Sequence, residues 1–123
     1  MSAALILLPL LAQAGVVVSA QPDRTDRIDV AYEELAQGRP EAAIKRIEAN
    51  RSLERDDPSR LINLGAAYAQ LGDRSRAASY YRGALVSTVR YDVQLSDGTW
   101  LDSRRAARMG LEARNGETAI AVR

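Results

Sequence analysis

The sequence predicts an all-α fold of antiparallel helical hairpins, with a small β-hairpin inserted before the last helix. First, apolar residues recur at intervals of three and four over residues 61–85, on both sides of Gly72, as they do on amphipathic helices. Second, the same offset of 34 positions relates Gly38 to Gly72 and Ala43 to Ala77. Third, apolar and polar residues alternate after the second hairpin, which is typical of a β-strand.

Residues 1–20 are expected to be a signal peptide. Residues 3–18 are almost wholly apolar, and Val18-Ser19-Ala20 supplies the small residues of a cleavage site. The run is shorter than the roughly 20 residues of a membrane-spanning helix, and Pro9 interrupts it. The expected location is therefore periplasmic or secreted. A retained anchor in the inner membrane is the alternative, and only in that case is a membrane a partner.

Residues 21–27 are expected to form a linker, and the first hairpin covers about residues 26–55. Its first helix is capped by Thr25 or Asp26, and Gly38 ends it, since glycine accepts the left-handed conformation of a C-terminal cap. Pro40 suits the first turn of the second helix. The apolar stripes of the two helices are Ile28, Ala31 and Leu35, and then Ala43, Ile44 and Ile47.

The second hairpin covers about residues 58–89. Pro58 is expected to start its first helix, Gly72 to end that helix, and Asp73 to cap the next. The small residues Gly65 and Ala77 should let the two helices approach closely, with Tyr68 and Tyr81 filling the space beside them. The stripes are Leu61, Leu64, Tyr68 and Leu71, and then Ala77, Tyr81, Ala84 and Leu85.

The segment of about residues 90–102 predicts a β-hairpin. Arg90–Leu95 should pair with Thr99–Asp102 around the turn signal Asp97-Gly98. Because an isolated hairpin is marginal in water, its apolar face, including Trp100, is expected to pack on the helices. The alternative is that Thr99 caps a helix beginning at Trp100.

The last helix is expected over about residues 103–114, either as the first helix of a third repeat or as a cap. Ala107, Gly110 and Leu111 should form its inner face, and Asn115-Gly116 its end. Residues 115–123 are expected to be a flexible tail.

Residues 61–84 resemble the tetratricopeptide repeat, whose pattern is a large apolar residue, x2, Leu-Gly, x2, Tyr, and then Ala, x3 and an aromatic residue. Those places are held here by Leu61, Leu64, Gly65, Tyr68, Ala77 and Tyr81. The offset of 34 positions equals the length of this repeat. The first hairpin departs from the pattern, because Glu34 and Ile47 stand where aromatic residues are expected. The resemblance implies an αα superhelix whose inner face holds another protein or peptide.

On that resemblance, the candidate groove lies on the inner face of the first helices. Asn63 and Gln70 are expected to hydrogen-bond an extended peptide backbone, while an arginine binds a carboxylate. The alternative is that these are ordinary polar residues on an exposed helix face. The candidate binding residues are Tyr32, Ile62, Asn63, Ala66, Gln70 and Arg105.

Composition excludes several other function classes. The 17 basic and 16 acidic residues nearly balance, which argues against nucleic acid as a partner, because phosphate binding needs a basic face. The sequence has no Cys or His, so thiol nucleophiles, disulfides, Cys/His zinc sites and imidazole bases are excluded. Asp56 and Asp57 lack a third ligand nearby and are interpreted as a solvated helix start.

The sequence therefore predicts a non-enzymatic protein–protein interaction module with no cofactor, no metal and no catalytic residue. Its partner is a protein or peptide whose identity the sequence does not give. The alternative function is a membrane-anchored accessory subunit or a self-associating structural subunit, since two hairpins alone bury little core and repeat stacks usually need about three.

Overall fold

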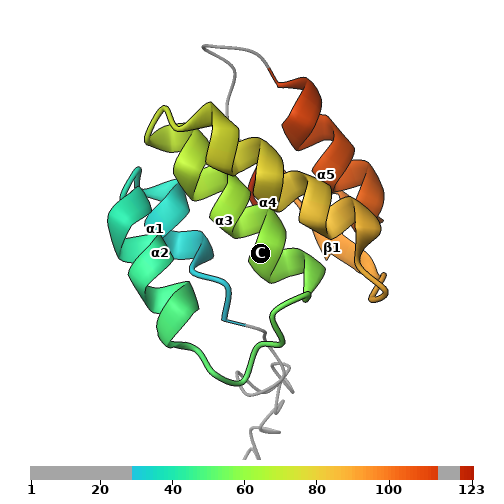
Figure 1. Ribbon diagram of the computed structural model, residues 1–123, viewed down its shortest axis with the longest axis horizontal. Coiled ribbons are helices and arrows are strands. Elements are labelled where there is room, and N and C mark those ends of the chain that lie inside the picture. The colour runs from blue at the N-terminus through green and yellow to red at the C-terminus, as the bar shows by residue number, and fades with distance from the viewer. Residues whose placement is uncertain (1–28, 114–119) are drawn as a thin grey trace, which may run out of the picture.

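The structure, a computed structural model, describes residues 29–113 and 120–123. These residues are mainly helical, with a small two-stranded antiparallel sheet (Figure 1). The expected signal peptide, the linker and the helix end at Asn115-Gly116 lie outside them. The elements in chain order are α1 (Tyr32–Ala36), α2 (Pro40–Ala49), α3 (Pro58–Gln70), α4 (Arg74–Val86), β1 (Asp92–Gln94), β2 (Trp100–Asp102) and α5 (Ser103–Glu112).

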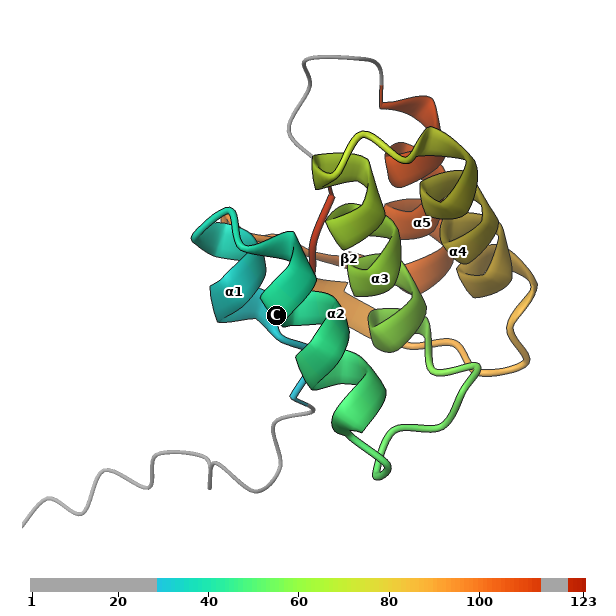
Figure 2. The same cartoon turned by 60° about the vertical axis from the view of Figure 1, so that its left-hand side comes forward.

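The helices pack side by side in chain order, with α1 and α2 at one end, α3 and α4 in the middle, and α5 at the other end (Figure 1, Figure 2). The most extensive contacts join α3 to α4 and α4 to α5. Helix α3 also contacts both α1 and α5, so the first helices of the two hairpins and the last helix are neighbours. Two apolar clusters form the described core, one around Tyr81 and Val122 and the other around Leu35 and Ile47.

The predicted helix ends in the second hairpin are confirmed. Asp57 caps α3 by accepting a hydrogen bond from the Arg60 N–H (3.0 Å), and Pro58 occupies the first helical position. Helix α3 ends at Gln70, and Gly72 follows with a φ of 79°. Asp73 then caps α4, as expected, through the N–H of Arg76.

The first helix starts later than the sequence predicts. The expected stripe began at Ile28, which lies outside the described residues, but α1 begins only at Tyr32. Asp29 Oδ1 accepts a hydrogen bond from the Ala31 N–H (3.2 Å), and Ala31 takes a left-handed φ of 59°. Val30 is buried. These contacts hold the chain in a turn, which overrides the helical pattern.

Tyr81 is the centre of the predicted close approach. Its ring is buried and lies 3.0 Å from where a Cβ on Gly65 of α3 would sit. A Cβ on Gly110 of α5 would overlap the same ring. Both glycines therefore leave the volume that the ring fills, and the expected inner face of the last helix is confirmed at Ala107 and Gly110. Tyr68, by contrast, is half-buried and stacks on Tyr80.

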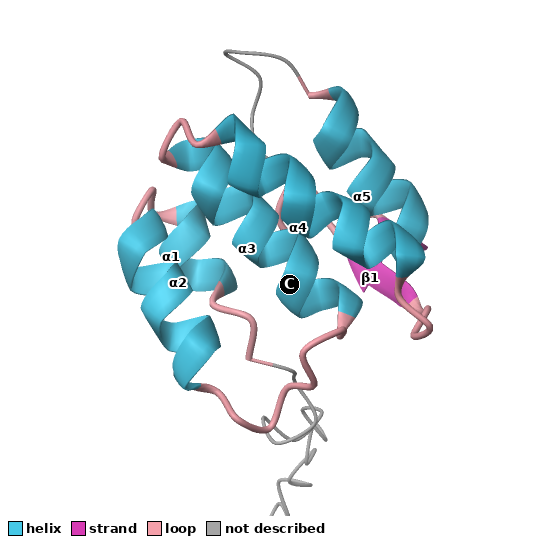
Figure 3. Cartoon of the chain, viewed as in Figure 1, coloured by secondary structure: helices cyan, strands magenta, loops and turns pink. Residues whose placement is uncertain are grey.

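The predicted β-hairpin is present but shorter (Figure 3). Val93 of β1 pairs with Leu101 of β2, and this pair faces the helices. Trp100 pairs with Gln94 on the opposite face and is 63% exposed, so the prediction that it packs on the helices is wrong. The alternative helix starting at Trp100 is also wrong, because Asp102 caps α5 at Ser103.

Candidate functional site

The structure places half of the predicted groove residues in the interior. Ile62, Asn63 and Ala66 of α3 have no exposed surface, so the prediction that they face a partner directly is wrong for the described chain. The reason is that Ile62 and Ala66 belong to the two core clusters and that residues 120–123 bond Asn63.

Residues 120–123 lie over the predicted groove. In Figure 2 the end of the chain descends behind α3, and the C mark stands beside α1 and α2. Val122 is fully buried and joins the larger core cluster. The prediction of a flexible tail is therefore wrong for residues 120–123, while residues 114–119 lie outside the described part of the chain.

Asn63 holds this segment by its backbone. Its Oδ1 accepts a hydrogen bond from the Val122 N–H (2.7 Å), and its Nδ2 donates to the Val122 carbonyl (2.7 Å). The same Nδ2 donates a second bond to the Val30 carbonyl (2.9 Å). The amide thus joins Val30 and Val122, which are far apart in sequence, to α3, and its donors and acceptor are satisfied despite full burial. The expected partner of Asn63 was the backbone of another chain, whereas in the structure the amide bonds backbone groups of its own chain.

The segment also extends the small sheet. Val122 forms an antiparallel bridge with Leu95, and the Arg123 N–H donates to the Gln94 carbonyl (2.9 Å). Gln94 also pairs with Trp100 of β2, so residues 120–123 lie at the other edge of β1. Edge pairing of this kind is a common way for proteins to bind an extended peptide.

The two ends of the segment have their own contacts. The Tyr81 hydroxyl donates to the Ile120 carbonyl (3.0 Å). The Arg123 guanidinium lies over the Tyr32 ring, 4.7 Å from its centroid, and donates to the Ser96 carbonyl (3.2 Å). An arginine over a tyrosine face is attracted by the electrons of the ring. Of the predicted groove residues, Tyr32 therefore contacts the segment through the face of its aromatic ring.

Gln70 and Arg105 do not join this site. Gln70 Nε2 donates to the Leu35 carbonyl of α1 (3.0 Å), a bond between the two hairpins. Arg105 is exposed on α5, and its side chain makes no hydrogen bond or ion pair within residues 29–113 and 120–123. Tyr32 and Asn63 thus both contact residues 120–123, while Ile62 and Ala66 lie in the adjoining core.

Burial sets the electrostatics of two tyrosines near the site. Burial of the Tyr81 hydroxyl raises the pKa of that group, and the bond to Ile120 only partly opposes it. Burial raises the pKa of Tyr91 to about 12. The Tyr91 hydroxyl lies 2.9 Å from both oxygens of Asp57 and from Ser59 Oγ, which ties the β-hairpin to the start of α3. Both hydroxyls are therefore neutral donors at neutral pH.

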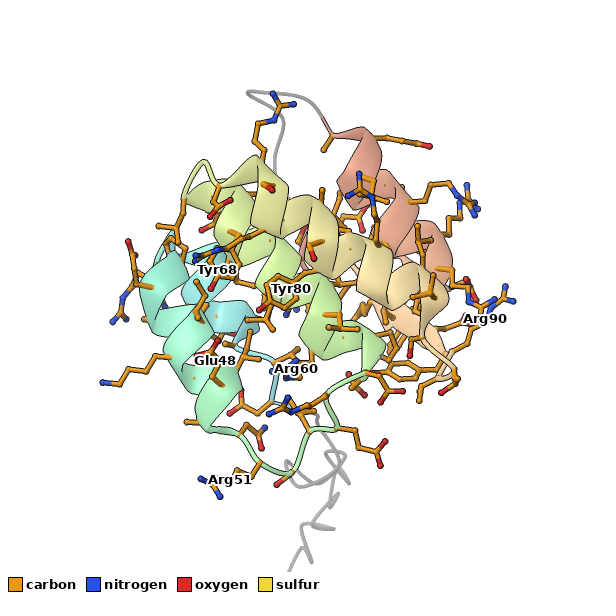
Figure 4. The ribbon with its side chains drawn as sticks, viewed as in Figure 1. Glu48, Arg51, Arg60, Tyr68, Tyr80 and Arg90 are labelled. Atoms are coloured by element: carbon orange, nitrogen blue, oxygen red, sulfur yellow. The ribbon has the colours of Figure 1, made fainter. Side chains whose placement is uncertain are left out.

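A polar hollow, separate from the contacts of residues 120–123, lies at the connector between α2 and α3. It has a volume of about 730 Å³, and Figure 4 shows Glu48 and Arg60 beside it and Arg51 on the connector. Its charges are mixed, with three arginines and three acidic residues. Among the described residues, no group of three or more Asp or Glu is placed to hold a metal ion. Its lining residues are Glu48, Asn50, Arg51, Leu53, Glu54, Arg55, Asp56 and Arg60.

No family model, curated protein or solved structure matches the chain. The interpretation of the site therefore depends on its own geometry.

Sequence reasoning missed the residues that complete the site. Gln94 and Leu95 act through backbone groups, which no motif reveals, and Tyr81 was assigned to the helix interface alone. Ile120 and Val122 carried the one readable signal, since β-branched residues alternate there with Ala121 in the pattern of a short strand.

Proposed function

We propose that this protein is a non-enzymatic protein–protein interaction module of the tetratricopeptide repeat type, which binds an extended protein or peptide segment on the face formed by α1 and α3. Two features of the helical part support the repeat assignment. The end of α1 and the end of α3 are 34 residues apart, as are the starts of α2 and α4, and α3 contacts both α1 and α5 as neighbouring repeats do.

The observation that carries the proposed binding role is the pairing between Asn63 and Val122. A carboxamide that donates to a carbonyl and accepts from the N–H of the same residue matches any extended backbone, whatever its side chains. Such an amide in the interior would be costly to leave unpaired. The face of α3 is thus chemically suited to hold extended chain.

We also propose export, with a cleaved leader over residues 1–20, on the sequence pattern alone. None of the described helices is long and apolar enough to cross a membrane. Sequencing the N-terminus of the protein from its native host tests this proposal. A first residue near Gln21 is the expected result, and Met1 or Ser2 in a membrane fraction would favour the anchored alternative.

A peptide selection tests the binding role. Peptides selected from a random library against the full chain should bind at least tenfold more weakly to Tyr32→Ala, because the Tyr32 ring lies on the binding face. Trp100→Ala is the matched control, since it removes an exposed aromatic ring from the far side of the hairpin. Binders that keep their affinity for Tyr32→Ala, or that lose affinity only with Trp100→Ala, would refute the proposed function.

A further inference from the structure

The segment 120–123 is held mainly through its backbone. Four of its backbone groups form hydrogen bonds: the carbonyl of Ile120, the N–H and the carbonyl of Val122, and the N–H of Arg123. The groups that bind them come from α3, α4 and β1. We define the cradle as these three residues, Asn63, Tyr81 and Gln94, together with Tyr32, whose ring lies under the Arg123 guanidinium, and Leu95, which forms the bridge with Val122. Because backbone groups are common to all sequences, the cradle accepts an extended strand in general.

The side chains of the segment define what else the cradle selects. Val122 is completely buried, so this position accepts an aliphatic residue of that size and excludes a charge. Ile120 packs on the cluster around Tyr81, and Ala121 packs on the cluster around Leu35. Arg123 adds a cation over Tyr32. The chemistry that fits is therefore aliphatic, small, aliphatic, arginine, in extended conformation.

An empty cradle would leave strong polar groups without partners. Asn63 Oδ1 and one Nδ2 bond have no other partner among the described residues, and the Tyr81 hydroxyl would lose its only acceptor there. Buried polar groups without partners are costly, so the cradle needs an occupant. Among the described residues, the occupant is the four-residue segment 120–123. Four residues bury far less surface than a specific partner protein does.

We propose that the cradle is a docking site for an extended segment of a partner protein with this chemistry, and that residues 120–123 are its intramolecular competitor. This inference rests on the proposed function and adds its ligand class and its regulation. A tethered segment acts at an effective concentration in the millimolar range. A partner must therefore displace it, and the apparent dissociation constant of the partner equals its intrinsic value divided by the fraction of chains whose cradle is empty.

A labelled peptide of residues 117–123, Glu-Thr-Ala-Ile-Ala-Val-Arg, is the probe. The full chain carrying Val122→Asp should bind it at least tenfold more tightly than the unchanged chain, because a carboxylate cannot occupy the buried Val122 position. The matched control is the same peptide with its own valine replaced by aspartate, which should not bind either chain. Equal binding of the unmodified peptide to both chains would overturn the proposal.

A disulfide lock keeps the test decisive if Val122→Asp fails to fold. Leu95 and Val122 face each other across the bridge, and the chain has no other cysteine, so the double variant Leu95→Cys, Val122→Cys can be closed and opened by redox. The oxidised chain should not bind the peptide, and the reduced chain should bind it. Equal binding in both states would overturn the cradle.

Two further outcomes distinguish this proposal from peptide binding elsewhere on the chain and from exchange of residues 120–123 between copies. Peptides from the random selection that bind the locked chain as well as the open one would overturn the cradle while the interaction role stands. An unchanged chain that is dimeric, and becomes monomeric with Val122→Asp, would overturn the partner proposal in favour of exchange of residues 120–123 between copies. A monomer in both cases excludes this exchange, and the peptide measurement then decides the partner proposal.

Discussion

Replacing Asn63 with aspartate tests how the centre of the molecule is held together. The exchange keeps the size of the side chain and keeps an oxygen that accepts from the Val122 N–H. It removes both donated bonds, to the carbonyls of Val30 and Val122. It also places a carboxylate at a fully buried position, facing two carbonyl oxygens.

The expected cost follows from those two carbonyls. Each buried acceptor that loses its donor costs about 1–3 kcal/mol, so the two together cost about 2–6 kcal/mol, with a further penalty for burying the charge. That is a large part of a stability that is typically about 5–15 kcal/mol for a domain. Gln70→Glu is the matched control, because it breaks a single bond, to Leu35, from an exposed side chain. Its cost should stay below about 1 kcal/mol.

Urea unfolding at pH 7 and at pH 4 measures both variants. Burial without a cation raises the pKa of the introduced carboxyl in the folded state, so its protonated form favours folding. The loss caused by Asn63→Asp should therefore be largest at pH 7 and should shrink as the pH falls toward the unfolded value of about 3.9. Equal losses for Asn63→Asp and Gln70→Glu, or a loss independent of pH, would refute the assigned role of Asn63.

Two further predictions concern the packing and titration of tyrosines. Gly110→Ala should destabilise the protein by about 1–3 kcal/mol, because the added Cβ would overlap the Tyr81 ring. Gly83→Ala should stabilise it by about 0.5–1 kcal/mol, since the added Cβ meets only ordinary contacts. Thermal melts in which both variants move in the same direction would contradict this. Burial raises the folded pKa of Tyr91 from 10.0 to about 12, so its stabilising contribution is complete below pH 10 and is lost as the pH rises through 12. Asp57→Asn keeps a capping side chain but removes a negative charge, so ultraviolet titration of the tyrosinates should show Tyr91 ionising at lower pH, and an unchanged titration would count against that contact.

The central hairpin could be predicted from sequence because its signals are local. Gly72 with positive φ, the capping Asp73 and the small Gly65 beside Tyr81 each act within a few residues or across one helix pair. Local chemistry of this kind sets helix ends independently of the rest of the fold. The helical reading of residues 58–86 is therefore confirmed.

The start of α1 and the exposure of Trp100 could not be predicted, since both depend on distant partners. Val30 lies in a turn instead of a helix because its carbonyl accepts a hydrogen bond from Asn63, which is 33 positions away. Trp100 faces outward because Val93 and Leu101 occupy the face of the hairpin that meets the helices. A hydrophobic side chain on a two-stranded hairpin has two possible faces, and the register decides between them.

The candidate groove was predicted to bind a partner, and the structure gives its residues other contacts. Asn63 was expected to bond extended backbone, and it does so with Val122 of the same chain. The resemblance to a peptide-binding repeat carries no information about what lies beyond the repeats. A four-residue segment with two aliphatic side chains is also too short for a firm strand prediction.

Amide hydrogen exchange of the full chain tests the cradle most directly, because it needs no substitution and no partner. The Val122 and Arg123 amides donate to Asn63 and Gln94, so both should exchange much more slowly than in the free peptide of residues 117–123. Exchange of both amides at the rate of the free peptide would contradict the placement of residues 120–123 in the cradle.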